Sequence, residues 1–284
     1  MSVIIPVLNG ARDLPRQLEA LADQRFYRHW EVIVADNGST DETIATALCF
    51  QGRLPCIRVV NASARAGQSY ARNAAARQAR GKFLLFLDAD DVVTPGYLMA
   101  MASALDEHPF VTSRLDCESL NPRWLWSSRP PTQVDGVGTS FSFLPSTAVG
   151  CTGIWKTTFD SVGGFDLEVV PGEDVDLSWR VQLSQGCEPR FVPNATVMYQ
   201  YRQTFRGIFA QGRGYGSAGP KLYRRYRDRG MPRRPWQVAL RYHGAVLWRL
   251  ARSRSKSDLA ACVFLFGFRV GLLEGSIQER VIYL

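Results

Sequence analysis

The chain contains an acidic cluster directly after an apolar run. Residues 83–87 are Phe-Leu-Leu-Phe-Leu, and Asp88, Asp90 and Asp91 follow within four positions. Like charges this close repel one another, so the cluster costs free energy unless a cation neutralises it. Such oxygens are natural ligands for a hard divalent ion such as Mg²⁺ or Mn²⁺, which would be held by one or two carboxylates together with substrate phosphates. The alternative is a solvated acidic turn that only ends a strand and caps the next helix.

The elements around the cluster predict where it lies. Five large apolar residues in a row suit a strand that is buried on both faces. Strand and helix signals alternate through the first hundred residues, which indicates an α/β protein with a mostly parallel sheet and right-handed crossovers. The expected strands are 2–7, 31–35, 57–60 and 82–87. Because ligands bind beyond the carboxyl ends of the strands in open parallel sheets, the acidic cluster is expected at the binding edge.

Capping patterns predict the starts of two helices in this half. Ser39 and Glu42 have the spacing of a capping box, so a helix is expected to begin there. Thr94 and Pro95 suit the N-cap and N1 positions of a helix that runs through Leu105. A third helix is expected from the Ala-rich residues 67–80, closed by the glycine that follows them.

The second half is less regular. From 110 to 150 the periodicity fades, and prolines and glycines indicate irregular loops. Beyond these loops we expect a strand, a helix and another strand at 152–155, 174–185 and 191–197. After 202 the chain is aromatic, basic and expected to be helical. Its apolar stretch at 258–273 is short for a bilayer span, which leaves an interfacial helix or a core helix as the readings.

Polar residues lie at four places that the predicted sheet brings to one edge. The segment Pro6-Val7-Leu8-Asn9 follows the first strand, Asp36 follows the second, and Asp88-Ala89-Asp90 follows the fourth. Arg72 lies in the helix before that fourth strand. A carboxylate such as Asp36 can accept a base N–H group, and a guanidinium can pair with phosphate. Each feature also has a plain alternative, because Asn-Gly pairs form ordinary turns and Arg72 can be a surface residue of its helix.

At this point the chain resembles the family 2 glycosyltransferases. The resemblance rests on ordered segments that cover about residues 1–200, namely SVIIPVLN (2–9), VADNGSTD (34–41), ARNAA (71–75), LDADD (87–91), VGGFD (162–166) and GEDVDLSWR (172–180). It implies a GT-A fold, with a single Rossmann-like sheet flanked by helices. It also implies a nucleotide-sugar donor and inversion at the anomeric carbon.

The resemblance also implies roles for individual residues. Pro6, Val7, Asn9, Asp36 and Arg72 would hold the nucleotide. Asp88 and Asp90 would hold a divalent cation, Mn²⁺ or Mg²⁺, as the DxD pair, with Asp90 preferred as the direct ligand and Ala89 between them against the donor. Glu173 would contact substrate, and Asp174, the second residue of the Glu-Asp pair, would be the catalytic base.

Transfer of a sugar requires such parts for chemical reasons. Displacing a nucleoside diphosphate needs a Lewis acid for the charge that builds on the leaving phosphate. It also needs a base within reach of the acceptor hydroxyl, on the face opposite the leaving group. Asp174 is far from Asp90 in the sequence and begins a new helix, so it can close the site from the other side. The alternative is that Asp174 or Asp176 only caps that helix.

The chain departs from the family pattern in two ways. Many relatives have a histidine in the strand after the Glu-Asp helix, but residues 194–202 contain none, so water or donor phosphate would take the place of a third protein ligand for the metal. The Q-x-x-R-W signature of processive synthases is also absent, so transfer of one or a few sugars is expected. We weakly favour UDP or dTDP as the nucleotide. Trp155 is a candidate platform for stacking on a sugar, or else a core residue.

The charge is concentrated in the C-terminal part of the chain. Residues 202–256 hold thirteen Arg and two Lys against one Asp, a net charge of +14 in a chain whose total is +8. We therefore divide the chain into a transferase domain over 1–200 and a basic helical extension over 201–284. Within the domain we expect a nucleotide half over 1–91 and an acceptor half over 92–200.

Three readings of the basic extension remain open. It can face an anionic membrane surface, where a glycan or lipid-linked acceptor of the cell envelope would be presented, or it can be a solvated face packed on the domain. The rival from another class is a nucleic-acid or membrane-surface binding module with a non-catalytic domain, although the acidic strand end would repel a polyanion. Six scattered cysteines without a CxxC pair fit a reducing cytoplasm. We therefore expect a cytoplasmic protein, which the basic extension can attach peripherally to the inner face of the plasma membrane.

Overall fold

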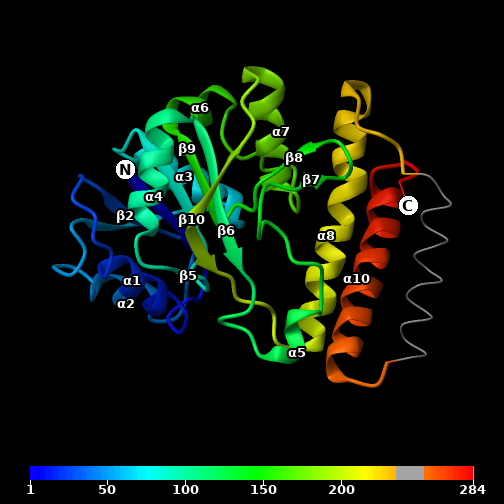
Figure 1. The fold of residues 1–284 in the computed structure, drawn as a ribbon, viewed down its shortest axis with the longest axis horizontal. Helices are drawn as coiled ribbons and strands as arrows, with labels where there is room; N and C mark the ends of the chain where they lie inside the picture. Colours follow the sequence, from blue (N-terminus) through cyan, green and yellow to red (C-terminus); the bar gives the residue numbers. More distant parts are fainter. Residues whose placement is uncertain (235–252, 284) are drawn as a thin grey trace.

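A curved eight-stranded sheet forms the centre of this computed structural model, which describes residues 1–234 and 253–283 (Figure 1). The strands lie in the order β3 (Ile57–Asn61), β2 (Glu31–Asp36), β1 (Ser2–Val7), β4 (Phe83–Leu87), β9 (Cys151–Trp155), β6 (Phe110–Asp116), β10 (Arg190–Met198) and β5 (Val92–Val93). A separate short hairpin joins β7 (Thr139–Ser140) to β8 (Leu144–Pro145).

The first four strands of this order, β3 to β4, are parallel, as the alternating pattern predicts. Beyond β4 the sheet is mixed: β9 is antiparallel to both β4 and β6, and β5 is antiparallel to β10. The chain leaves β1 in one direction through β2 and β3, and then returns to β4 on the other side of β1. Their carboxyl ends therefore meet at a topological switch point, where open α/β sheets bind ligands.

Two layers of helices cover the sheet and explain the apolar runs. The helices are α1 (Leu14–Ala22), α2 (Thr43–Leu48), α3 (Gln68–Gln78), α4 (Tyr97–Glu107), α5 (Arg123–Trp126), α6 (Lys156–Ser161) and α7 (Glu173–Gln185). Leu85 and Leu87 of β4 pack in the cluster that contains α1 and α4. Leu84 and Phe86 pack in the cluster that contains α3, α6 and α7. The apolar run is therefore buried on both faces, as predicted.

Three local predictions are wrong. Strand β6 lies inside the stretch expected to be irregular, because its buried polar residues Thr112 and Ser113 mask the apolar pattern. Helix α4 begins at Tyr97 instead of following the Thr94-Pro95 pair, since the Thr94 hydroxyl donates to the carbonyl of Thr196 (3.1 Å).

The expected capping box before α2 also does not form. The Ser39 hydroxyl accepts a hydrogen bond from the backbone N–H of Asn9 (2.9 Å), so it is used to join the loops after β1 and β2. The helix begins at Thr43, whose N–H donates to the side chain of Asp41 (3.1 Å).

The C-terminal extension contains two long helices, α8 (Phe205–Tyr226) and α10 (Lys256–Gln278), which lie side by side and run in the same direction (Figure 1). The short turn η1 (Arg227–Arg229) follows α8. Glycines let the two backbones touch: a Cβ on Gly216 would lie 2.0 Å from the carbonyl oxygen of Phe268, and one on Gly271 would lie 1.9 Å from that of Arg213. The close packing of α8 on α10 therefore depends on the absence of side chains along this glycine seam.

Helix α10 is long and apolar enough to cross a membrane, with a mean hydropathy of 1.6, but 56% of the apolar window is buried against the rest of the protein. Phe264 of α10 and Ile208 of α8 belong to the same core cluster as β1 and β4. Trp179 of α7 packs in a further cluster with Leu222 of α8 and Leu272 of α10. The hydrophobic core thus continues from the sheet into the extension, and the domain division at residue 200 stays a prediction.

A matched pair of substitutions in α8 tests the close packing of α8 against α10 at the glycine seam. Gly216→Ala forces a methyl group into the backbone of α10, so we expect the free energy of unfolding to fall by about 1–3 kcal/mol, as overpacked sites do. Gly214→Ala adds the same methyl group to the same helix where the nearest atom outside that helix, the Cγ of Pro171, is 3.9 Å away. There the lower entropy of the unfolded chain should leave stability unchanged or raise it by about 0.5–1 kcal/mol.

Urea unfolding followed by circular dichroism measures both variants. Equal effects of the two substitutions would contradict a close-packed seam between α8 and α10.

Candidate active site

The acidic cluster and the predicted base line one cavity of about 850 Å³. Asp88 and Asp90 enter it from the loop after β4, and Glu173 and Asp174 enter it from the first turn of α7. Most of the remaining wall comes from the loops within 131–149, from the 199–202 loop and from helices α8 and α10. The structure therefore brings together two pairs of carboxylates that are far apart in the sequence.

Arg72 connects these two pairs of carboxylates. Its side chain on α3 has no exposed surface, so it is not a surface residue of its helix. Its Nη2 donates to the Oδ1 of Asp88 (2.7 Å), and its Nη1 lies 3.6 Å from the Oε1 of Glu173. The guanidinium also lies over the ring of Phe165, at 5.7 Å from its centroid. A fully buried charge needs such partners, because an unpaired one is strongly destabilising.

The residues predicted to hold the nucleotide lie at the same sheet edge. Strand pairing places Pro6 opposite Ala35 and Val7 opposite Asp36. Asp36 is 5% exposed, and its carboxylate accepts hydrogen bonds from the N–H groups of the turn that follows it, Gly38 (3.2 Å) and Ser39 (3.2 Å).

Asn9 has a left-handed backbone (φ 53°), and its Oδ1 accepts a hydrogen bond from the N–H of Thr40 (2.8 Å). Asn9 thus joins the loops after β1 and β2. Pro6, Val7, Asn9 and Asp36 are not among the residues that line the 850 Å³ cavity, so their predicted contact with a nucleotide stays a prediction.

The acidic loop fits a divalent ion only in part. A Cβ on Gly150 would lie 2.7 Å from the Oδ2 of Asp88, so the missing side chain leaves that oxygen room. The chemistry of the donor atoms also fits, since carboxylate oxygens suit Mg²⁺ and Mn²⁺. Among the described residues, however, no group of three or more His, Cys, Asp or Glu could hold a metal by itself. An ion held here by Asp88 and Asp90 would take its other ligands from phosphate and water.

The loop after β10 packs against the acidic loop through two polar contacts. Arg202 pairs with Asp90 there, with its Nη1 3.2 Å from the Oδ2 of the carboxylate. The neighbouring Asp91 is buried, and its Oδ1 accepts a hydrogen bond from the N–H of Gln200 (2.8 Å). Burial and the charges of Asp88 and Asp90 raise the pKa of Asp91 well above its usual range.

Asp174 has the properties of a proton acceptor. Burial and the neighbouring charge of Glu173 raise the pKa of its carboxyl to about 7, against the lowering effects of the Val175 N–H and of Arg72. The N-cap of α7 is Gly172, and no side chain caps this helix, so Asp174 is not the capping residue. A carboxyl group with a pKa near neutrality in a cavity suits general base catalysis.

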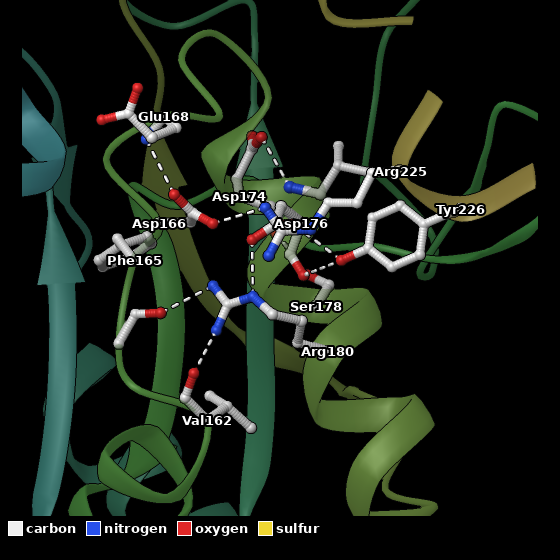
Figure 2. A network of polar contacts seen from close by, with 12 residues as sticks. Val162, Phe165, Asp166, Glu168, Asp174, Asp176, Ser178, Arg180, Arg225 and Tyr226 are labelled. Carbon is white, nitrogen blue, oxygen red and sulfur yellow. Dashed lines mark hydrogen bonds and ion pairs between the residues drawn. The ribbon is translucent and has the colours of Figure 1, made fainter. Parts of the chain in front are cut away.

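Asp176, the other candidate for a cap, belongs to a structural network that fixes α7 (Figure 2). Its side chain is fully buried and accepts hydrogen bonds from the Nε of Arg180 and from the hydroxyl of Tyr226, each at 2.7 Å. Arg180 also donates to the carbonyls of Val162 (2.6 Å) and Gly164 (2.7 Å).

Helix α8 contributes to this network as well. Arg225 pairs with Asp176, with 3.3 Å between its Nε and the Oδ1 of the carboxylate, and it also pairs with Asp166 (Figure 2). The network therefore ties the first turn of α7, which carries Asp174, both to the VGGFD turn and to helix α8. Arg225, one of the basic residues of the extension, is thus explained by contacts within the chain.

The structure does not bring Trp155 to the site, which corrects its prediction as a stacking platform. Strand β9 is antiparallel to β4, so Trp155 pairs with Phe83 at the end of β4 opposite to Asp88. Its indole N–H donates to the carbonyl of Leu105 (2.7 Å). Trp155 thus packs as a structural residue at the far edge of the sheet.

Some residues of the site could not be found from the sequence. Gly150 lies in the irregular stretch, and only its distance to Asp88 reveals its importance. Arg202 is one of many arginines of the basic extension, so its place beside Asp90 is visible only in the structure. Tyr199 and Tyr215 line the cavity from the 199–202 loop and from α8.

Comparison with known proteins agrees with this geometry. Residues 2–162 match the family model described as Glycosyl transferase family 2. Over 82% of its length the chain is 29% identical to the pre-mycofactocin glycosyltransferase of Mycobacterium tuberculosis, of which it covers 49%. Over 38% of its length it is 34% identical to the poly(ribitol-phosphate) β-N-acetylglucosaminyltransferase TarS of Staphylococcus aureus, of which it covers 19%. The chain thus spans about half or less of the length of these curated relatives.

Solved structures share the fold at low sequence identity. A mannosyltransferase from Pyrobaculum calidifontis, in complex with GDP-Man and Mn²⁺, has a TM-score of 0.67 at 17% identity, and the match covers 96% of this chain and 86% of that one. The S. aureus TarS fragment 1–349 in complex with UDP has a TM-score of 0.56 at 17% identity, with coverage of 100% and 92%.

The buried network around Asp176 predicts a large loss of stability on substitution. Asp176→Asn removes the negative charge that faces Arg180 and Arg225, so we expect the free energy of unfolding to fall by about 3–5 kcal/mol. Asp160→Asn is the matched control, because Asp160 is 54% exposed and pairs with Lys156 only at the surface. That substitution should change stability by less than about 1 kcal/mol. Chemical unfolding of both variants decides the point, and similar losses for the two would contradict a structural role for Asp176.

Proposed function

The chain belongs to glycosyl transferase family 2 and has its GT-A fold, and from this premise we propose that it is an inverting, metal-dependent glycosyltransferase. It transfers a sugar from a nucleoside-diphosphate sugar to an acceptor hydroxyl. We further propose a role in the synthesis of a cell-envelope glycan, glycolipid or polysaccharide, with one or a few sugars added. The names of TarS and of the mycobacterial relative support a glycan or small-molecule acceptor, but the donor sugar differs among the structural neighbours.

One observation carries the proposal. The carboxylates of Asp88 and Asp90 and the carboxyl group of Asp174, whose pKa is about 7, line the same cavity from different elements. Transfer with inversion needs this arrangement, since the leaving group and the attacking hydroxyl lie on opposite faces of the sugar. A solvated acidic turn would have no reason to share a cavity with a carboxyl group of raised pKa.

The chain's own residues perform the remaining tasks. Arg72 fixes the orientation of Asp88 and offsets the negative charge of the acidic loop. Asp174 accepts the proton of the acceptor hydroxyl, and the network of Asp176 holds its helix in place. A divalent ion held by Asp88 and Asp90 would stabilise, as a Lewis acid, the negative charge on the departing diphosphate.

The donor site lies toward β1 and β2 in this proposal. Pro6, Val7, Asn9 and Asp36 hold the nucleotide, with UDP or dTDP weakly favoured, and Ala89 and Glu173 contact the donor sugar or the acceptor. UDP, UDP-GlcNAc and GDP-Man are bound in the neighbouring structures, which supports a nucleotide-sugar donor without favouring one base.

Substitution of the base gives the most direct test of the reaction. Asp174→Asn keeps the shape of the side chain but cannot accept a proton, so we expect transfer to fall by at least about 10²-fold. In the wild-type protein, the activity kcat/KM should rise with pH and level off above about 7, because the ionised form of Asp174 is the base. The variant should lose this pH dependence in whatever transfer remains. Both quantities come from initial rates of nucleoside diphosphate release.

Asp160→Asn serves as the control, because it removes an exposed carboxylate outside the cavity. Wild-type rates in a folded Asp174→Asn protein would remove Asp174 from the mechanism.

We also propose that the basic segment 202–256 faces an anionic membrane surface in the cytoplasm, where an envelope acceptor would be presented. Its net charge of +14 and the exposed apolar residues Phe266, Leu273 and Ile277 of α10 support this. Flotation with liposomes that contain anionic lipid should carry the protein upward at low salt and release it at high salt. Absence of salt-sensitive binding would contradict electrostatic attachment.

A further inference from the structure

We propose that Arg202 is an exchangeable counter-ion, which covers Asp90 until the donor arrives and then pairs with the diphosphate. The divalent ion can therefore occupy Asp90 fully only when the donor is present. This inference rests on the proposed function and adds a named residue that couples the binding of metal and donor.

The ion pair of Arg202 with Asp90 has the properties of a contact that can be exchanged. The side chain of Arg202 is 57% exposed, that of Asp90 is 25% exposed, and a single contact of 3.2 Å joins them. Because the arginine end of the pair is in solvent and a single contact joins the two groups, the pair contributes little to stability, and breaking it costs little free energy. A diphosphate offers a guanidinium more negative charge and bidentate oxygens.

Arg72 provides the contrast within the same loop. Its side chain is fully buried, and it holds Asp88 at 2.7 Å while also facing Glu173. Removing a buried guanidinium from its partners is costly, so Arg72 stays in place whether or not donor is bound. The two carboxylates expected to hold the metal thus have different arginine partners, one fixed and one mobile.

The backbone that carries Arg202 is well anchored, so the exchange needs only side-chain rotation. The N–H of Gln200 donates to the Oδ1 of Asp91 (2.8 Å), and the N–H of Tyr201 donates to the Oδ1 of Asn121 (2.8 Å). Arg202 also lines the same 850 Å³ cavity as Asp88 and Asp90, so its head group can reach the space where a diphosphate would bind.

Electrostatics then couples the two ligands. A divalent ion at Asp90 competes with the guanidinium for the same oxygen, so the ion binds weakly alone. A diphosphate draws the guanidinium away and adds its own oxygens to the ion, so each ligand raises the affinity for the other. By linkage, the factor is the same in both directions.

The test is binding of Mn²⁺ alone, without nucleotide or turnover, measured by the electron paramagnetic resonance signal of free Mn²⁺. Arg202→Gln should bind Mn²⁺ roughly fivefold more tightly than the wild-type protein, the factor expected for loss of an exposed competing ion pair. In the same assay, saturating UDP should tighten Mn²⁺ binding more in the wild-type protein than in the variant.

Arg206→Gln is the matched control, because Arg206 is an exposed arginine in the first turn of α8 that loses the same charge. It should leave the affinity for Mn²⁺ close to that of the wild-type protein. If Arg206→Gln changed the Mn²⁺ affinity as much as Arg202→Gln, the change in net charge alone would explain both effects, and the proposed exchange of Arg202 would be overturned. Equal Mn²⁺ affinity of Arg202→Gln and the wild-type protein, including no measurable binding by either, would overturn it as well.

A further variant separates this inference from the proposed function. Asp90→Asn should weaken Mn²⁺ binding in the presence of UDP. If it does not, the metal site itself is misplaced and the proposed function fails at that point. If it does, while Arg202→Gln has no effect, only the exchange is wrong.

Discussion

The site depends on one buried cation. Arg72 has no exposed surface, and its guanidinium lies between the carboxylates of Asp88 and Glu173. A charge in such a place is tolerated only if the fold delivers partners to it. The end of β4 and the start of α7 must therefore both lie next to α3, and the position of Asp174 follows from that of Glu173. In this way a single electrostatic constraint sets the distance between the donor side and the base side of the cavity.

Other polar contacts also hold these elements in place. The buried Asp176, with Arg180, Arg225 and Tyr226, fixes α7 against α8, so the extension supports the first turn of α7 and also lines the cavity. The glycine seam brings α8 and α10 close enough to form one rigid wall. The ion pair of Arg202 with Asp90 is closer to the solvent and weaker, so a ligand can displace it.

The sequence predicted the fold where one physical signal dominated. The apolar runs of β1 and β4 and the glycine after α7 were sufficient, because burial on both faces and a left-handed C-cap (Gly186, φ 67°) each leave a clear pattern. It failed for β6, where Thr112 and Ser113 are buried by hydrogen bonding, a tertiary effect that no periodicity shows.

The site was predicted in the same uneven way. The motif residues Asp88, Asp90 and Asp174 do share a cavity, but the burial of Arg72 and the position of Trp155 at the opposite sheet edge depend on strand order. Antiparallel β9 reverses the direction expected from a parallel sheet, and that alone removes Trp155 from the site.

The central claim is that the acidic strand end binds a diphosphate through a divalent ion. Isothermal titration calorimetry with UDP, dTDP and GDP, in Mn²⁺ and then in excess chelator, tests it most directly. We predict that at least one of these nucleotides binds in Mn²⁺ and that its affinity falls by at least about tenfold in chelator, since the ion bridges carboxylates and phosphates. Equal affinity in chelator, or no binding of any of them in Mn²⁺, would contradict the account.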